Sequence, residues 1–540
     1  MSANNVIPFR QKTDTNPPGA AAPSYAELVA ATNFSFLRGA STAQNMIISS
    51  LLLGHSGIGI ADCNTVAGVV RAWTELKQFR KDGLPTRKKV REGGSPGEHG
   101  WVEHPDEEKL AEIKQDLKKR ACEFKLTVGA RLVFTDGTPD VVPYPQNKDG
   151  WGRLCRLLTR GKLEPPPGKS RAIKGECHLT LEDLIDFSRD LLLIVMPGDR
   201  LEGLAEHLVR LNASTFTWLG VTMHRRGNDV RRLVKLKDIA RAAGVSLIAT
   251  NDAIYHSAGQ RDLQDVMTCI REGVTIHEAG RLLEENAERH LKPPEEMARL
   301  FEKAPEAIEQ TQVFQALIDF DLEQLRYEYP QEPVPPGWTD QDYLEDRAWF
   351  YAGMKYRWRI PQKVKRLLRK ELKFIRRHRM APYFLTIFDI VRVAEDMGIL
   401  CQGRGSAANS AVCYALGITS VNPAGFELLF ERFLSRERAN EPPDIDVDFE
   451  HERREEVIQH IYNRYGRERA GIVATIIHYR PRSAMREVGK VFGLTEDVTG
   501  RLAGLVWGSW GPAPSNEQLR QAGLDPANPI FRQALHFANR

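Results

Sequence analysis

The chain has 540 residues, of which 42% are hydrophobic and 27% are charged, and its 75 Lys and Arg against 71 Asp and Glu leave a net charge of only +4. This length predicts several globular domains and excludes a single small module, and the composition excludes a disordered or fibrous chain. Apolar runs such as residues 191–196 are far shorter than the ~20 residues that span a bilayer, and the first residues lack the apolar core of a signal peptide. With seven cysteines and no C-x-x-C motif, these features predict a soluble, cytoplasmic protein.

Residues 23–280 form the first predicted domain, after a flexible tail of residues 1–22. Strands are predicted at residues 57–61, 191–196, 217–223 and 245–250, and helices at residues 201–211 and 229–243. Because strands that alternate with helices pair mainly in parallel, the pattern predicts an α/β domain with a parallel sheet or a βα barrel. Residues 82–107, rich in Gly, Pro and charge, are expected to form an exposed loop.

A strongly basic stretch, residues 355–379, lies in the second predicted domain, residues 281–475. The stretch contains twelve Lys and Arg but one acid, Glu371. Its apolar residues recur at helical spacing and predict an amphipathic helix with a basic outer face: Val364, Leu367, Leu368, Leu372 and Ile375. Such a face favours contacts with a nucleic-acid phosphate backbone. The alternative is a solvated basic helix without a partner.

An acidic segment with period two follows in the sequence PPDIDVDF, which starts at Pro442. On a strand, Asp444, Asp446 and Asp448 share one face, while the intervening apolar residues face the core. Carboxylates this close raise one another's pKa, and a divalent cation relieves the repulsion most simply. Carboxylate oxygens completed by water and substrate phosphate describe a Mg²⁺ site for phosphoryl transfer. Two alternatives are a solvated acidic strand and a calcium loop, which needs Gly where Phe449 stands.

A glycine-rich segment, GRGSAANS, begins at Gly403 and precedes the helical pattern AVCYAL. Glycines let a backbone approach a ligand closely, Ser406 can cap the helix, and free N–H groups at the helix start can hold phosphate oxygens beside Arg404. A simple helix cap is the alternative interpretation. With the acidic strand shortly after it, the segment has the layout of a nucleotidyltransferase palm.

A basic ridge is predicted beyond the acidic strand. Arg482, Arg486 and Lys490 recur every four residues on a probable helix. The ridge can follow a nucleic-acid backbone, or it can be an ordinary exposed helix face.

These segments closely resemble bacterial C-family DNA polymerases, and among them the error-prone, lesion-bypass branch related to the alpha subunit of DNA polymerase III. The resemblance covers about residues 23–500. The similar segments are YAEL and NFSFLRGAS near the start, ATNDAIYH from Ala249, PYFLTIFDIV from Pro382, CQGRGSAANS from Cys401, FERFLSRER from Phe430 and PPDIDVDFEHERREE from Pro442.

The resemblance implies an N-terminal polymerase and histidinol phosphatase (PHP) domain, a nucleotidyltransferase-like α+β palm, and a helical thumb that starts near residue 476 and is partial in residues 476–540. Members of this family add deoxynucleotides to a primer 3′ end on template DNA, with two Mg²⁺ ions between carboxylates and phosphates. By motif, Asp444 and Asp446 are the catalytic metal ligands, with Asp448 as a weaker third. Four residues are implied to cradle the triphosphate: Gly403, Arg404, Gly405 and Ser406. Arg482, Arg486 and Lys490 are implied to contact DNA.

The PHP metal site of the family is degenerate in this chain. Val29 and Ala31 replace its first histidine pair, Asp62-Cys63 replaces an Asp-His pair, Ile254 replaces a further histidine, and Arg131 ends the segment Gly129-Ala130-Arg131. Three scattered candidates remain: Asp62, Asp252 and His256. The resemblance therefore predicts a structural PHP domain without metal and without nuclease or phosphatase activity.

Length is the second departure from the family, whose members are about twice as long. The third catalytic carboxylate, the fingers and segments for a sliding clamp and damage-induced mutagenesis proteins are expected beyond Arg540. The 540-residue chain is therefore expected to be inactive by itself. Two alternatives to the polymerase stay open: a PHP-type phosphoesterase and a non-catalytic DNA-binding scaffold.

Overall fold

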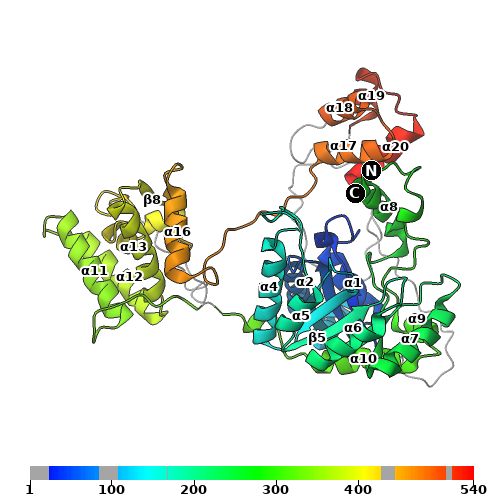
Figure 1. Cartoon of the computed structure of the whole chain (residues 1–540). Helices are drawn as coiled ribbons and strands as arrows, with labels where there is room; N and C mark the ends of the chain where they lie inside the picture. The colour runs from blue at the N-terminus through cyan, green and yellow to red at the C-terminus, as the bar shows by residue number, and fades with distance from the viewer. Residues whose placement is uncertain (1–23, 84–106, 167, 327, 427–443, 506–513) are drawn as a thin grey trace. The chain divides into compact units, whose positions relative to one another are not determined.

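The computed structural model describes residues 24–83, 107–166, 168–326, 328–426, 444–505 and 514–540 (Figure 1). The chain forms two compact units, one that runs to Leu325 and resumes at His478, and one of residues Arg326–Ile477. Both strands and helices occur in each unit, so the protein is a mixed α/β multidomain protein. The predicted tail, most of the predicted loop at 82–107 and the FERFLSRER segment lie outside the described residues.

Within the described ranges, seven strands build the first unit, in two sheets. Strands β1 (Ala26–Ala30), β2 (Gly57–Cys63) and β3 (Lys125–Arg131) are parallel. In the other sheet β4 (Asp140–Pro145) runs antiparallel to β5 (Leu191–Met196), and β6 (Thr217–Val221) and β7 (Ser246–Ala249) continue in parallel. Isolated bridges, Ala30 with Ala253 and Leu132 with Val141, link the two sheets at both edges.

Helices connect and cover these strands. They are α1 (Ala43–Leu53), α2 (Val69–Asp82), α3 (Glu107–Glu123), α4 (Lys148–Leu163), α5 (Leu181–Phe187), α6 (Leu204–Ser214), α7 (Asp229–Ala243), α8 (Arg261–Glu272), α9 (Pro294–Leu300) and α10 (Pro305–Ala316). Neighbouring residues of β5 belong to different cores: Leu192 and Ile194 to one, Leu191 and Leu193 to another. A strand buried on both faces reads as a continuous apolar run, which explains why β5 was predicted with its correct bounds.

The first unit extends past the boundary predicted at residue 280. Phe314 of α10 packs edge-on against Tyr144 of β4 and Trp218 of β6, with ring centroids 5.5 and 4.9 Å apart. The Thr311 hydroxyl also accepts a hydrogen bond from the Ala26 amide of β1. Because α10 fills the core beneath the strands, residues up to Leu325 belong to this unit.

The C-terminal helices also belong to the first unit. They are α17 (Pro481–Val491), α18 (Glu496–Gly504), α19 (Asn516–Gln521) and α20 (Pro529–Asn539). Val488 and Val491 of α17 share an apolar cluster with Val266 and Cys269 of α8, beside which α17 lies in Figure 1. Arg540 forms an ion pair with Asp262 of α8 at 3.0 Å.

The described part of the second unit contains five helices and a two-stranded sheet, with a main core of apolar residues. Its elements are α11 (Asp340–Lys355), α12 (Gln362–Arg377), α13 (Ala381–Asp396), β8 (Cys401–Arg404), α14 (Ala411–Ala415), β9 (Asp446–Phe449) and α16 (Arg454–Tyr465). The core holds Leu368 of α12, Phe384 of α13 and Val412 of α14. Residues 328–338 contain no helix or strand.

No helix in the described ranges combines the length and apolar character that a membrane crossing requires.

Candidate functional site

Strands β8 and β9 pair antiparallel and bring the two predicted motifs together. Gly403 lies opposite Val447, and Arg404 lies opposite Asp446. The Ser406 hydroxyl donates a 2.7 Å hydrogen bond to the backbone carbonyl of Asp444. The glycine-rich segment and the acidic strand are therefore neighbours in the fold, although many residues separate them in the sequence.

The three aspartates share one exposed face of the acidic strand. Asp444, Asp446 and Asp448 are exposed, whereas Ile445 is buried in the core of the unit. This alternation agrees with the period predicted from the sequence. The segment is an extended strand through Phe449, and a calcium loop would turn sharply there, so the calcium-loop alternative is wrong.

Arg404 neutralises part of this acidic face. Its Nε atom lies 3.0 Å from Asp448 Oδ2, and both side chains are more than half exposed. Among the residues that the structure describes, no group of three or more His, Cys, Asp or Glu could hold a metal ion. The role of the three carboxylates as metal ligands stays a prediction. Asp444 and Asp446 still present exposed carboxylate oxygens, and Mg²⁺ is commonly held by one or two carboxylates together with water and substrate phosphate.

Two glycines shape the turn after β8. Gly405 has φ of +65°, a conformation that L side chains rarely adopt, and it starts a 3₁₀ turn over Gly405–Asn409. The Gly403 amide donates a 2.6 Å hydrogen bond to the Ile418 carbonyl. A Cβ atom on Gly403 would lie 2.2 Å from that carbonyl oxygen. The backbone can close in this way only with glycine at position 403.

Glu371 of α12 occupies the start of α14, where the sequence predicted free amides for phosphate. Its carboxylate accepts hydrogen bonds from the Ser410 hydroxyl at 2.7 Å and from the amides of Ala411 and Val412 at 2.9 and 3.0 Å. Ser410 also accepts from the Cys413 amide, so Ser410 caps the helix. The expectation that Ser406 caps this helix is wrong, and the amides of Ala411 and Val412 are already used.

The sequence contained a signal for Glu371 that the prediction did not use. Glu371 falls on the apolar stripe of α12, together with Val364, Leu368, Leu372 and Ile375, and it is fully buried. A buried charge requires paired or hydrogen-bonded partners. An acidic residue at a core position of an otherwise basic helix therefore indicates that hydrogen-bond donors elsewhere in the protein are buried beside it.

Glu371 is expected to make the free energy of unfolding depend on pH. Burial raises its pKa to about 7, although the amides of Val412 and Ala411 and the Ser410 hydroxyl act in the opposite direction. A carboxyl whose pKa is raised by folding stabilises the fold below its unfolded pKa, and this contribution is lost as the pH rises through the folded pKa. Between about pH 5.5 and pH 7.5 the loss should be roughly 2 kcal/mol. Urea unfolding of wild type and Glu371→Gln at both pH values tests this, because the variant should lack this part of the slope.

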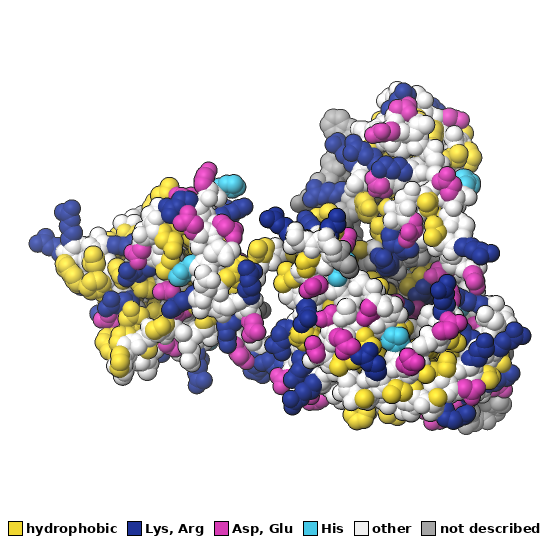
Figure 2. Space-filling view, viewed as in Figure 1, with side chains coloured by type: hydrophobic (Ala, Val, Ile, Leu, Met, Phe, Trp, Pro, Cys, Tyr) yellow, Lys and Arg dark blue, Asp and Glu magenta, His cyan; other side chains and the backbone are white. Residues whose placement is uncertain are grey.

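The basic helix α12 has the predicted amphipathic form. Six basic side chains are exposed on it: Arg366, Arg369, Lys370, Lys373, Arg376 and Arg377. Arg376 pairs with Glu345 at 2.7 Å, and Arg369 lies over the Trp349 ring. Figure 2 shows Lys and Arg side chains projecting from the surface of the second unit. Part of the basic face is therefore partnered within the protein, and part faces solvent.

The predicted ridge on α17 is also present. Arg482, Arg486 and Lys490 are exposed on this helix, while Met485 and Val488 are buried. Lys490 forms an ion pair with Glu487 at 2.9 Å. The ridge belongs to the first unit and the acidic strand to the second.

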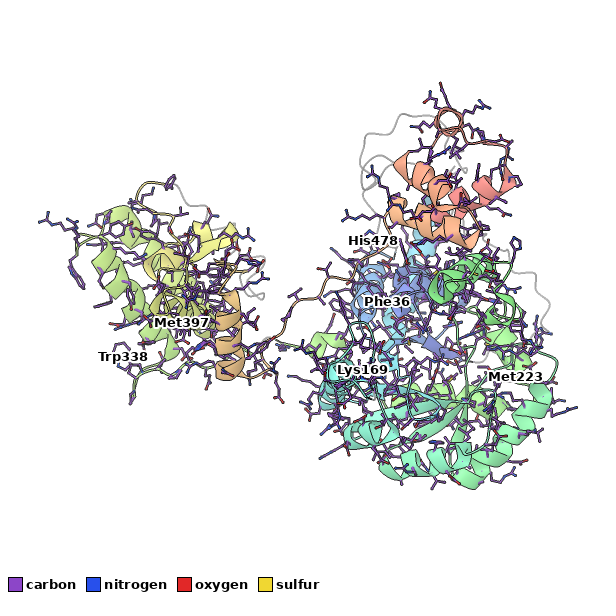
Figure 3. The ribbon with its side chains drawn as sticks, turned by 45° about the horizontal axis from the view of Figure 1, so that its top comes forward. Phe36, Lys169, Met223, Trp338, Met397 and His478 are labelled. Carbon is purple, nitrogen blue, oxygen red and sulfur yellow. The ribbon has the colours of Figure 1, made fainter. Side chains whose placement is uncertain are left out.

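The residues that the resemblance assigns to the PHP metal site lie at or shortly after the ends of strands in the first unit. Phe36, which comes shortly after β1, is labelled in Figure 3. Asp62 is buried and accepts hydrogen bonds from the Thr32 amide and the Ser35 hydroxyl, both at 2.7 Å. His256 Nδ1 lies 2.7 Å from the Ser41 hydroxyl. Ala31 and Ile254, which stand where the resemblance implies histidines, pack in a small apolar cluster.

Asp252 lies in a network of arginines at these strand ends. Arg131 Nη1 and Arg289 Nη2 lie 2.7 and 2.8 Å from its two carboxylate oxygens. Burial alone would raise the pKa of Asp252, but the two guanidinium groups lower it well below its ordinary value. A neighbouring cavity of about 230 Å³ is lined by Arg131, Arg289 and Cys63, among other residues. The charge of Asp252 is thus balanced by protein cations.

Comparisons with known proteins agree with the resemblance seen in the motifs. Residues 342–540 match the bacterial DNA polymerase III alpha NTPase domain family. An error-prone DNA polymerase of Bradyrhizobium diazoefficiens is 50% identical over 522 residues, which are 96% of this chain and 42% of that protein. One of Rhodopseudomonas palustris is 52% identical over 520 residues, which are 96% of this chain and 43% of that protein.

The chain therefore resembles error-prone DNA polymerases over nearly its whole length, and it spans less than half the length of these relatives. Among solved structures, a putative metal-dependent phosphoesterase from Bifidobacterium adolescentis matches 43% of this chain and 88% of that chain, with 11% identity and a TM-score of 0.27.

Proposed function

We propose that the chain carries the nucleotide-binding part of a template-directed DNA polymerase of the error-prone, damage-tolerance (translesion) type. The observation that supports this most is the pairing of β8 with β9, which sets the Gly-Arg-Gly-Ser segment against the exposed aspartates. A segment for a triphosphate and a pair of carboxylates side by side are what nucleotidyl transfer requires. The similarity to error-prone DNA polymerases agrees with this chemistry.

In this proposal Asp444 and Asp446 hold Mg²⁺, and Asp448 is a weaker candidate. Mg²⁺ held by these carboxylates would supply positive charge to activate a primer 3′-hydroxyl and to offset charge on a leaving pyrophosphate. Arg404 and the backbone of Gly403, Gly405 and Ser406 bind the triphosphate. Arg404 then exchanges its contact with Asp448 for phosphate oxygens, because a guanidinium binds either anion through the same donors.

The remaining parts have supporting roles in the proposal. The second unit is the palm, the helices from about residue 476 begin the thumb, and Arg482, Arg486 and Lys490 contact the DNA backbone. The seven strands of the first unit, with the bridges at both edges, form a PHP-type βα barrel without catalytic activity. Primer–template DNA and deoxynucleotides are the substrates. A sliding clamp and damage-induced mutagenesis proteins are partners predicted by the resemblance alone.

Binding of a fluorescent dATP analogue to the 540-residue chain, with and without Mg²⁺, tests the proposal. Wild type should bind in a Mg²⁺-dependent manner, and Asp444→Ala and Asp446→Ala should each weaken binding at least about tenfold, since each removes a charged ligand. Glu455→Ala, which removes an exposed acid of the same unit, is the matched control and should bind as wild type. Mg²⁺-independent binding that survives both aspartate substitutions would instead support the DNA-binding scaffold.

A further inference from the structure

Glu371 is fully buried, and its hydrogen bonds all go to the segment that follows the glycine-rich turn. Two carboxylate oxygens accept from three donors, which lie on Ser410, Ala411 and Val412. A glutamine would present an NH₂ group to at least one of these donors, whereas a carboxylate has acceptors only. The three donors therefore suit a side chain with two acceptor oxygens better than an amide of the same size.

The segment that Glu371 holds is closed at its other end onto β8. Helix α14 ends at Ala415, and three residues later the Ile418 carbonyl accepts the hydrogen bond from the Gly403 amide at 2.6 Å. Residues 403–418 thus form a loop with joined ends. One end carries Arg404, paired in register with Asp446, and the start of α14 is fixed by Glu371.

We propose that Glu371 is a positioning residue for the nucleotide site, because it anchors the 403–418 loop to α12 and so keeps Arg404 and Ser406 beside the acidic strand. The effect of Glu371 on nucleotide binding rests on the proposed function, whereas the anchoring of the loop can be tested separately. Figure 3 labels Met397, which lies shortly before β8 and helps to locate the loop in the second unit.

A control variant is needed to distinguish general destabilisation of the second unit from loss of the hydrogen bonds that Glu371 makes to the 403–418 loop. Glu332 is a matched control, because it is also a buried carboxylate of this unit. It accepts hydrogen bonds from Thr386, Arg464 and Tyr465 and from no residue of the 403–418 loop. Glu332→Gln should disturb the unit without releasing the loop.

Amide hydrogen exchange of the 540-residue chain provides the first test. Glu371→Ala should speed exchange of the amides in residues 403–413 at least about tenfold, because three hydrogen bonds are lost. Ser410→Ala, which removes one of the three and is the milder variant if Glu371→Ala fails to fold, should have a smaller effect confined to the same residues. Unchanged exchange in this loop, or an equal increase in Glu332→Gln, would overturn the proposal.

Binding of the same dATP analogue with Mg²⁺ is the second test. Glu371→Ala should weaken binding about tenfold, Glu371→Gln should restore part of it, and Glu332→Gln should leave it within about twofold of wild type. Full affinity in Glu371→Ala would overturn the role in positioning. If wild type does not bind nucleotide, the proposed function fails, and loop exchange alone then decides whether Glu371 anchors the loop.

Discussion

Replacing Arg131 by methionine is expected to lower the free energy of unfolding by about 3 to 5 kcal/mol, because it removes one partner from a largely buried ion network. Arg131 bonds Asp252 and Asp140, each at 2.7 Å, and the Arg131 side chain is 21% exposed. After the substitution Asp252 keeps Arg289, while Asp140 loses the arginine that it contacts. Urea unfolding at neutral pH measures the loss.

The same experiment has an internal control and a pH signature. Arg299→Met removes an arginine that is 67% exposed and paired with Glu296, so its effect should be much smaller than that of Arg131→Met. The pKa of Asp252 is lowered in the fold, so the stabilisation it provides is present above about pH 4 and is lost as the pH falls further. The difference between wild type and Arg131→Met should therefore shrink in acid. Equal losses in both variants would contradict the role of the network.

Local patterns predicted the elements that depend on neighbouring residues in the chain. Helix α7 was predicted with its observed bounds. In the structure Asp229 lies in its first turn, and Gly244, with φ of +67°, ends the helix. The exposed aspartates of the acidic strand followed from the period of two alone. Strands β1, β3 and β4 were not predicted, since β4 contains two prolines and β1 contains the buried Glu27.

Contacts between distant residues could not be predicted from such patterns. Arg131 and Asp252 are 121 positions apart, and the sequence showed Asp252 only as a scattered metal-ligand candidate. Ser410 is 39 positions from Glu371, so the occupied start of α14 became visible only when α12 was packed beside it. The boundary at residue 325 likewise depends on α10 entering the core of the first unit. In each case the stabilising contact joins residues that are far apart in the sequence. The pattern around one of these residues does not identify the residue that it contacts.

Gly403→Ala is the second substitution with a large expected effect, and it acts on the candidate site directly. The new Cβ atom would lie 2.2 Å from the Ile418 carbonyl oxygen, a backbone atom that cannot swing aside as a side chain can. Removing this clash requires a backbone shift, and the shift also breaks the hydrogen bond from the Gly403 amide to the same oxygen. Overpacking and the lost bond together should cost about 3 kcal/mol or more.

Gly425→Ala is the matched control, because it adds the same methyl group in the same unit. The nearest atom to its Cβ would be the Asn422 carbonyl oxygen at 4.0 Å, so its stability should change by less than about 0.5 kcal/mol. Urea unfolding gives the two stabilities, and hydrogen exchange in residues 401–418 shows whether the loop has opened. A stable Gly403→Ala chain with a protected loop would mean that β8 tolerates a side chain at this position. The close approach of the Gly403 backbone to Ile418 would then not be what holds Arg404 opposite Asp446.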